Sequence, residues 1–153
     1  MICALFFFVL AVSAQHAQLS SSVTALSAGP VVFNQVDLIS EVSFAPGQSC
    51  VYVEKAGAYF VVAAPQVASN SLIYTFDCWL RVNGAGVANS NVRLGTIGIH
   101  KDVIITQGIL ALEPGDCVEV MTSGNALIEA IPVMGEPLIP SIIFSMFQIG
   151  KQK

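Results

Sequence analysis

Charged residues are scarce in this chain. Charged residues make up 10% of its 153 positions and apolar residues make up 54%, whereas ordinary soluble domains carry roughly 25% charged residues. A free subunit of this composition has too little polar surface to cover its core, so we expect it to associate with a membrane or with copies of itself. Only six residues are basic and the formal net charge is −4, which argues against a nucleic acid as partner.

Long apolar runs are also missing. Beyond the first residues, no uninterrupted apolar stretch reaches the ~18 positions that a membrane-spanning helix requires, so we expect no membrane span in the mature domain. The apolar residues there are rich in Val and Ile and are broken by Gly, Pro, Asn and Ser, a composition that favours short strands. No segment shows a period of 3.6 residues over a dozen positions. Assembly of a strand-rich subunit is therefore the better explanation of the composition.

Cysteine and histidine are too scattered to predict a metal site. The four cysteines include no Cys-x-x-Cys pair, and only two histidines could complete a zinc site. We expect no metal and no cofactor. Three cysteines lie in strand-like runs beyond Cys3, namely Cys50, Cys78 and Cys117. If the segment that contains Cys3 is removed, these three cannot all pair within one chain, and we interpret them as small buried hydrophobic residues.

The sequence contains few candidate residues for acid–base catalysis. His100 precedes Lys101 and Asp102 in a predicted turn with no nucleophile nearby, and we interpret it as a solvated loop residue. Asp116 and Glu119 flank a predicted turn and strand, where paired carboxylates could transfer protons or bind calcium. We interpret Asp116 instead as an acceptor for turn amides. We therefore predict no catalytic residue and expect the chain not to be an enzyme.

The first 14 residues carry no charge and have an apolar centre at residues 5–12. They end in Val12-Ser13-Ala14, which resembles the small-residue cleavage site of a secretory signal before Gln15. The segment lacks the basic residues that usually begin such a signal. An apolar arm that packs against a neighbouring subunit is an equal alternative.

A short polar stretch separates this segment from the rest of the chain. Residues 15–22 are small and polar and are predicted to form an arm or linker. The remaining length suits one domain with a sizeable core. We therefore divide the chain into an N-terminal segment, residues 1–22, and one folded domain, residues 23–153.

Residues 74–82 give the clearest structural signal. Apolar side chains at the even positions alternate with other side chains at the odd positions, and this period of two predicts a strand with one wholly apolar face. Trp79 lies on the other face between Asp77 and Arg81, which carry opposite charges. An Asn-Gly pair follows and predicts a tight turn. We expect a middle strand of a sheet whose second face is also largely buried.

Short strand candidates separated by turn residues fill the rest of the chain. They cover residues 31–36, 38–44, 50–53, 58–64, 92–99, 103–112, 117–122, 127–131 and 141–149. This spacing predicts an all-β fold, a two-sheet sandwich or jelly roll. Residues 103–110 and 142–147 are apolar on both sides, although a sandwich strand with an exposed outer face alternates. Their outer faces must be covered, and a ring closed by three-fold symmetry is one way to cover them.

Four motifs in their order along the chain resemble the C1q/TNF-like jelly-roll family. Residues 56–62 match its strand of the Gly-x-Tyr-x-Phe type, with Phe60 one place early, and residues 80–84 match its Asn-Gly hairpin. Residues 110–118 match its Leu-x-Leu-x-x-Gly-Asp-x-Val strand, turn and strand. A terminal aromatic strand with Phe144 and Phe147 completes the match.

This resemblance spans residues 30–149 and implies a compact homotrimer with aromatic strands packed around the three-fold axis. The residues that we expect to pack at the trimer interface are Tyr59, Trp79, Ile105, Leu110, Phe144 and Phe147. The residues that we expect to form turns are Asn83, Gly84, Gly115 and Asp116. The collagen stalk of animal C1q proteins is absent from the sequence, and so is the usual Gly of the last strand.

A narrower resemblance links residues 77–84, 87–91 and 135–144 to C1q-like proteins of bacteriophages and other large DNA viruses, whose trimers decorate capsids or form fibre parts. It implies a non-enzymatic structural protein on the virion surface, with copies of itself and a capsid or other virion protein as partners. The alternative is a secreted, extracellular C1q-like recognition module that binds a glycan or a protein through its loops. A mature chain that begins at Gln15 favours the second hypothesis.

Overall fold

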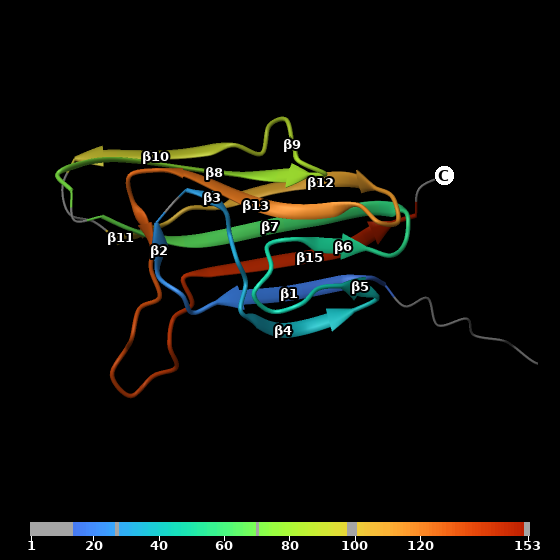
Figure 1. Cartoon of the computed structure of the whole chain (residues 1–153), viewed down its shortest axis with the longest axis horizontal. Coiled ribbons are helices and arrows are strands. Elements are labelled where there is room, and N and C mark those ends of the chain that lie inside the picture. The colour runs from blue at the N-terminus through green and yellow to red at the C-terminus, as the bar shows by residue number, and fades with distance from the viewer. Residues whose placement is uncertain (1–13, 27, 70, 98–100, 152–153) are drawn as a thin grey trace, which may run out of the picture.

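The computed structural model describes residues 14–26, 28–69, 71–97 and 101–151. In these ranges the chain forms strands, turns and loops but no helix. Two antiparallel sheets pack face to face as a sandwich (Figure 1), which confirms the predicted all-β, two-sheet architecture. None of these ranges contains a helix that is long and apolar enough to cross a membrane.

Eight strands form the larger sheet. They are β1 (His16–Ser21), β2 (Ala25–Leu26), β4 (Gln35–Ser40), β7 (Gly57–Ala68), β11 (Lys101–Val103), β12 (Thr106–Leu112), β14 (Leu127–Ile128) and β15 (Ile142–Gly150). The strand order is β2-β14-β7-β15-β1-β4, and β11 and β12 also pair with β7. Strands β1 and β15 lie side by side although they come from opposite ends of the described chain (Figure 1).

Seven strands form the smaller sheet. They are β3 (Gly29–Pro30), β5 (Val42–Ser43), β6 (Val51–Val53), β8 (Ile73–Val82), β9 (Ala85–Gly86), β10 (Val92–Ile97) and β13 (Cys117–Gly124). The order is β10-β8-β13-β6-β5, with β3 paired to β13 and β9 paired to β8. Strand β8 therefore has a neighbour on each side, as predicted for residues 74–82.

The core lies between the two sheets and takes alternate side chains from each strand. On β8 the predicted apolar face is confirmed, since Phe76 and Leu80 are fully buried. On β7 the buried set includes Tyr59. Phe33 and Phe144 meet inside the sandwich with their ring centroids 5.5 Å apart. Removal of these apolar surfaces from water is the main stabilising contribution to the fold.

Residues 15–22 were predicted to be an arm or linker, but they contain β1, so the folded domain begins earlier than predicted. Strand β1 pairs with β15 on one side and with β4 on the other. Its buried polar side chains are tolerated because their hydrogen bonds are satisfied. The Ser20 hydroxyl lies 3.1 Å from Asp37 Oδ1, and the Ser21 hydroxyl accepts from the backbone N–H of Val23 at 3.3 Å.

Two other predicted strands have different limits in the structure. The single strand predicted at residues 103–112 is divided into β11 and β12, because the pairing with β7 stops at Val103 and resumes at Thr106. The strand predicted at residues 31–36 begins only at Gln35. In both regions the apolar run is longer than the paired backbone, since apolar loop residues also pack against the core.

Cys50 and Cys117 are joined by a disulfide, with their Cα atoms 5.5 Å apart. The interpretation of all three cysteines as buried hydrophobic residues is therefore wrong for these two. The bond forms because β6 pairs with β13 and brings together residues that are 67 positions apart in sequence. Cys78 is a buried free cysteine, as predicted, and burial raises the pKa of its thiol to about 12.

Candidate assembly surface

The outer side of the larger sheet carries a largely apolar surface. Successive side chains of a strand leave opposite faces, and on β7, β12 and β15 the buried positions alternate with half-buried or exposed ones. Most of the outward side chains are apolar, and we define these as the apolar outer face, namely Ala58, Phe60, Val62, Ala64, Ile109, Ala111, Ile143 and Phe147. The outward set also includes the polar residues Gln66, Gln107 and Ser145, so these strands are largely apolar on both sides.

Phe60 lies at the centre of the apolar outer face. The strand register places Ile109 of β12 on one side of it and Phe147 of β15 on the other. The ring centroids of Phe60 and Phe147 are 5.4 Å apart. Ile109 is 68% exposed and Phe147 is 43% exposed. Three large apolar side chains therefore form one row across three neighbouring strands. In the single subunit Ile109 and Phe147 are exposed, and Phe60 between them is half-buried.

Contact with a second protein surface removes this row from water. Full burial of one large apolar side chain contributes about 1.5–3 kcal/mol, whereas association costs at least ~4 kcal/mol in lost translational and rotational freedom. A standard interface covers about 800 Å² per partner. This area is a small part of the 8891 Å² that the chain exposes, but it is larger than three side chains can supply. A stable interface therefore has to include the residues that flank the row as well as the row itself.

The structure corrects half of the predicted interface set. Three of the six residues are buried in the core of the single subunit, namely Tyr59, Leu110 and Phe144. Each stands one position along its strand from a residue of the apolar outer face, so its side chain points to the core and not to that face. Ile105 and Phe147 are 55% and 43% exposed. Trp79 lies on the outer side of the smaller sheet, away from this face.

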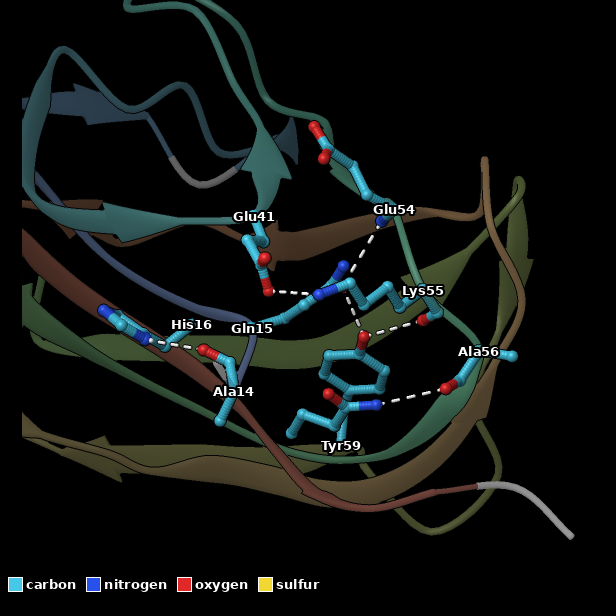
Figure 2. Close-up of polar contacts among 9 residues, drawn as sticks. Ala14, Gln15, His16, Glu41, Glu54, Lys55, Ala56 and Tyr59 are labelled. Atoms are coloured by element: carbon cyan, nitrogen blue, oxygen red, sulfur yellow. Dashed lines mark hydrogen bonds and ion pairs between the residues drawn. The ribbon is translucent and has the colours of Figure 1, made fainter. Parts of the chain in front are cut away.

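Tyr59 has a structural role inside the subunit (Figure 2). Its hydroxyl group lies 2.7 Å from the Lys55 carbonyl oxygen and also contacts the side-chain oxygen of Gln15. The backbone N–H of Glu54 donates to the same Gln15 oxygen at 3.3 Å. Burial, with a smaller contribution from the Glu41 carboxylate, raises the pKa of Tyr59 to about 12. The cluster joins the start of β1 to the turn that precedes β7.

The charged residues on the outer side of the smaller sheet are paired. Arg93 donates to both carboxylate oxygens of Asp77 at 2.7 and 2.9 Å, and these bonds lower the pKa of Asp77. Arg81 pairs with Glu119 of the neighbouring strand, with 2.6 Å between Nη2 and Oε2. Asp77 and Arg81 share one face, as the sequence indicated, but each is paired with another strand. The two outer faces of the sandwich therefore suit different contacts.

The four predicted turn residues are confirmed, and two of them bind each other. Asn83 and Gly84 have φ angles of 50° and 82°, and Gly115 has a φ angle of 90°. The Asn83 amide donates to Asp116 Oδ1 at 2.7 Å and accepts from the backbone N–H of Cys117 at 2.9 Å. The β8–β9 turn and the β12–β13 turn are therefore held together at one end of the sandwich.

The carboxylates that were considered for acid–base or calcium chemistry have structural partners. Asp116 Oδ2 accepts from the backbone N–H of Glu113 at 2.8 Å, in the role expected of a turn residue. Glu119 is buried and paired with Arg81. Among the described residues, no three His, Cys, Asp or Glu side chains are grouped to hold a metal. His100 lies outside the described residues.

No protein-family model matches this sequence, and no curated protein matches it either. The assignment of this face as a candidate assembly surface therefore rests on the geometry of the chain alone. Sequence reasoning missed Phe60, Ile109 and Ile143 as its components. Both alternating sets of β7 and β15 are apolar, so the pattern contains no signal that tells the outward set from the inward one.

Proposed function

We propose that this chain is a non-enzymatic structural protein, a homotrimeric jelly roll of the C1q/TNF-like kind whose subunits meet through the apolar outer face. The observation that carries the proposal is the row of Ile109, Phe60 and Phe147, in which the two outer residues are exposed and Phe60 is half-buried. Exposed apolar patches mark interaction sites. A second copy is the fitting occupant, because a ring closed by three-fold symmetry covers the same surface on every subunit.

The strand order supports the jelly-roll form of the sandwich. Strands β4, β1, β15, β7 and β12 are neighbours in one sheet, and β5, β6, β13, β8 and β10 are neighbours in the other. The chain crosses repeatedly from one sheet to the other between these strands. Two Greek keys wound into two sheets produce an order of this kind. The order of the sequence motifs, which resembles that of C1q/TNF-like proteins, also supports a jelly roll.

A projecting loop supports attachment of the trimer to a shell protein. The segment between β14 and β15 extends away from the sandwich (Figure 1), and a bridge between Ile131 and Ile139 closes its base. Met134 at its tip is 100% exposed, and Leu138 is 46% exposed. An apolar tip of this kind suits insertion into a pocket of a partner. In this proposal the partner is a capsid or other virion protein.

The disulfide between Cys50 and Cys117 supports a location on an oxidising exterior. Virion surfaces and the extracellular space both meet this condition. The second candidate is therefore a secreted recognition module that binds a glycan or a protein. The feature that favours it is the signal-like end of the N-terminal segment, Val12-Ser13-Ala14.

Two measurements on the natural protein separate these candidates. Mass spectrometry gives the N-terminal residue, and immunogold labelling shows whether the protein lies on virus particles. The proposal expects labelled particles, and it expects Met134→Asp trimers that no longer attach while Met134→Leu trimers do. A chain that begins at Gln15 and is recovered only from culture medium supports the recognition module and contradicts the virion role.

A further inference from the structure

A shallow groove lies on the outer side of the smaller sheet, between β8 and the segment that carries β9. Its volume is about 410 Å³, within the range of ~300–1,000 Å³ for small-ligand sites. The side chains and backbone that line it include Asp77, Trp79, Gly86, Asn89, Asn91 and Ser123. Figure 1 shows the β9 segment rising above the sheet. The groove belongs to one subunit and lies on the sheet opposite the apolar outer face, so it does not depend on assembly.

Trp79 forms the apolar wall of the groove. The side chain is half-buried and points to the outer side of β8. Gly86 lies across from it, where a Cβ atom would be 3.8 Å from both Cδ1 and Nε1 of the indole ring. Since Gly86 has no side chain, the space that a side chain would fill beside this edge of the ring is left free. Any larger residue at position 86 reduces the space beside the ring.

Ser90 holds the opposite wall in place. It is buried, and its hydroxyl donates to the Val87 carbonyl oxygen at 2.8 Å and accepts from the Leu80 backbone N–H at 3.0 Å. These bonds attach the loop to β8 and fix the two residues that flank Ser90. Those residues, Asn89 and Asn91, are exposed and belong to the groove lining. Because these bonds hold the loop backbone in place, less backbone freedom is lost when a ligand binds.

The groove offers hydrogen bonds without an unpaired charge. The side-chain amides of Asn89 and Asn91 make no hydrogen bond within the described residues, so each offers both donors and an acceptor. Asp77 is the one charged residue in the described lining, and Arg93 neutralises it through two hydrogen bonds. No Lys or Arg is part of that lining. The described lining of the groove therefore contains no cationic side chain that could bind an anionic ligand.

We propose that this groove is a binding site for a neutral saccharide. A pyranose ring has a face of C–H groups that packs on an aromatic ring, and hydroxyl groups at its edge that donate and accept hydrogen bonds. Trp79 supplies the aromatic surface, and the amides of Asn89 and Asn91 supply the polar partners. The neutral lining disfavours phosphorylated and strongly charged ligands. Trp79 thus acts in ligand binding and not in subunit packing.

Tryptophan fluorescence provides a direct test, because the chain contains a single tryptophan and that residue lines the groove. The probes are maltotriose, cellotriose, chitotriose, lactose and mannotriose, titrated separately into the full chain up to about 50 mM, beyond the millimolar range of weak binding. We expect a saturable change with at least one of them. No saturable change with any of the five overturns the proposal, and so does a response to short peptides alone.

Three variants locate the binding within the groove. We expect Asn91→Ala to weaken binding by about fivefold, the effect of one lost hydrogen bond, without disturbing the fold, since its amide has no partner in the described chain. We expect Gly86→Val to abolish binding by filling the space beside Trp79. Ala85→Val is the matched control, because Ala85 is the preceding residue of β9 and does not line the groove. Equal affinity in wild type, Asn91→Ala and Ala85→Val contradicts the assigned site, even if Gly86→Val fails to fold.

Discussion

Phe60 of β7 and Phe147 of β15 face each other on the outer side of the larger sheet, with their ring centroids 5.4 Å apart. Their neighbours in sequence on the inner side, Tyr59 and Met146, are buried in the core. Two adjacent strands therefore present large apolar groups to both sides of one sheet. The inner side is covered by the second sheet, and the outer side is not covered within the described chain.

We expect Ile109→Glu to split the assembly without unfolding the subunit. Ile109 is 68% exposed, so a carboxylate there is solvated in the single subunit, but in an apolar interface an unpaired charge is strongly disfavoured. Leu72→Glu is the matched control, because Leu72 is 70% exposed and lies outside the apolar outer face. Light scattering after gel filtration gives the mass of each variant. If both variants keep the mass of the wild type, the face has been assigned wrongly.

Alanine substitutions on the two sides of β15 should differ in their effect on stability. We expect Phe144→Ala to lower the free energy of unfolding by about 3–5 kcal/mol, the effect of a large cavity in a core. Phe147→Ala removes a half-exposed ring, and for the single subunit we expect a loss of about 1 kcal/mol or less. Urea denaturation of both variants measures the difference. Equal losses, or a larger loss for Phe147→Ala, contradict the side assigned to each ring.

The disulfide should make a large contribution to stability. It closes a loop between residues that are 67 positions apart, and the loss of chain entropy in the unfolded state corresponds to about 4 kcal/mol. We expect the Cys50→Ser, Cys117→Ser double variant to lose this amount in denaturant unfolding, and the wild type to lose a similar amount under reducing conditions. Cys78→Ala retains the bond and serves as the control. A wild type that is insensitive to reductant shows that the disulfide does not stabilise the fold.

Tyr59 should make the fold sensitive to alkali. Its pKa is about 12 in the folded chain and about 10 in an unfolded chain, so the folded state holds this proton more tightly. The stabilisation is fully present below about pH 10 and is lost as pH rises toward 12. We expect Tyr59→Phe to be less stable than the wild type at neutral pH and to show a smaller decline over that window. Parallel declines in the two proteins count against this role of Tyr59.

The β8 hairpin could be predicted from the sequence because two local signals agree. Its apolar residues alternate over nine positions, and Asn83-Gly84 accepts the positive φ angles of the turn. Strand β1 gave no such agreement. Its interior positions include the polar residues Ser20 and Ser21. They are buried because β1 lies between β15 and β4, and neither pairing can be read from the residues of β1 itself.

The sequence predicted the strands that carry the apolar outer face, but not which of their side chains belong to it. Both alternating sets of β7 and β15 are apolar, so hydrophobicity does not distinguish Tyr59 from Phe60 or Phe144 from Phe147. The second sheet decides which set is covered, and that sheet is formed by pairing between distant segments. The disulfide has the same origin, because Cys50 and Cys117 meet only through the pairing of β6 with β13.

The mass of the wild-type protein at micromolar concentration shows whether the subunits assemble. Sedimentation equilibrium measures this mass without dependence on molecular shape. If three subunits cover the row of Ile109, Phe60 and Phe147, our proposal predicts a mass of three times the 16.1 kDa of one chain. A folded, soluble protein with the mass of a single chain, and with these side chains open to water, contradicts it.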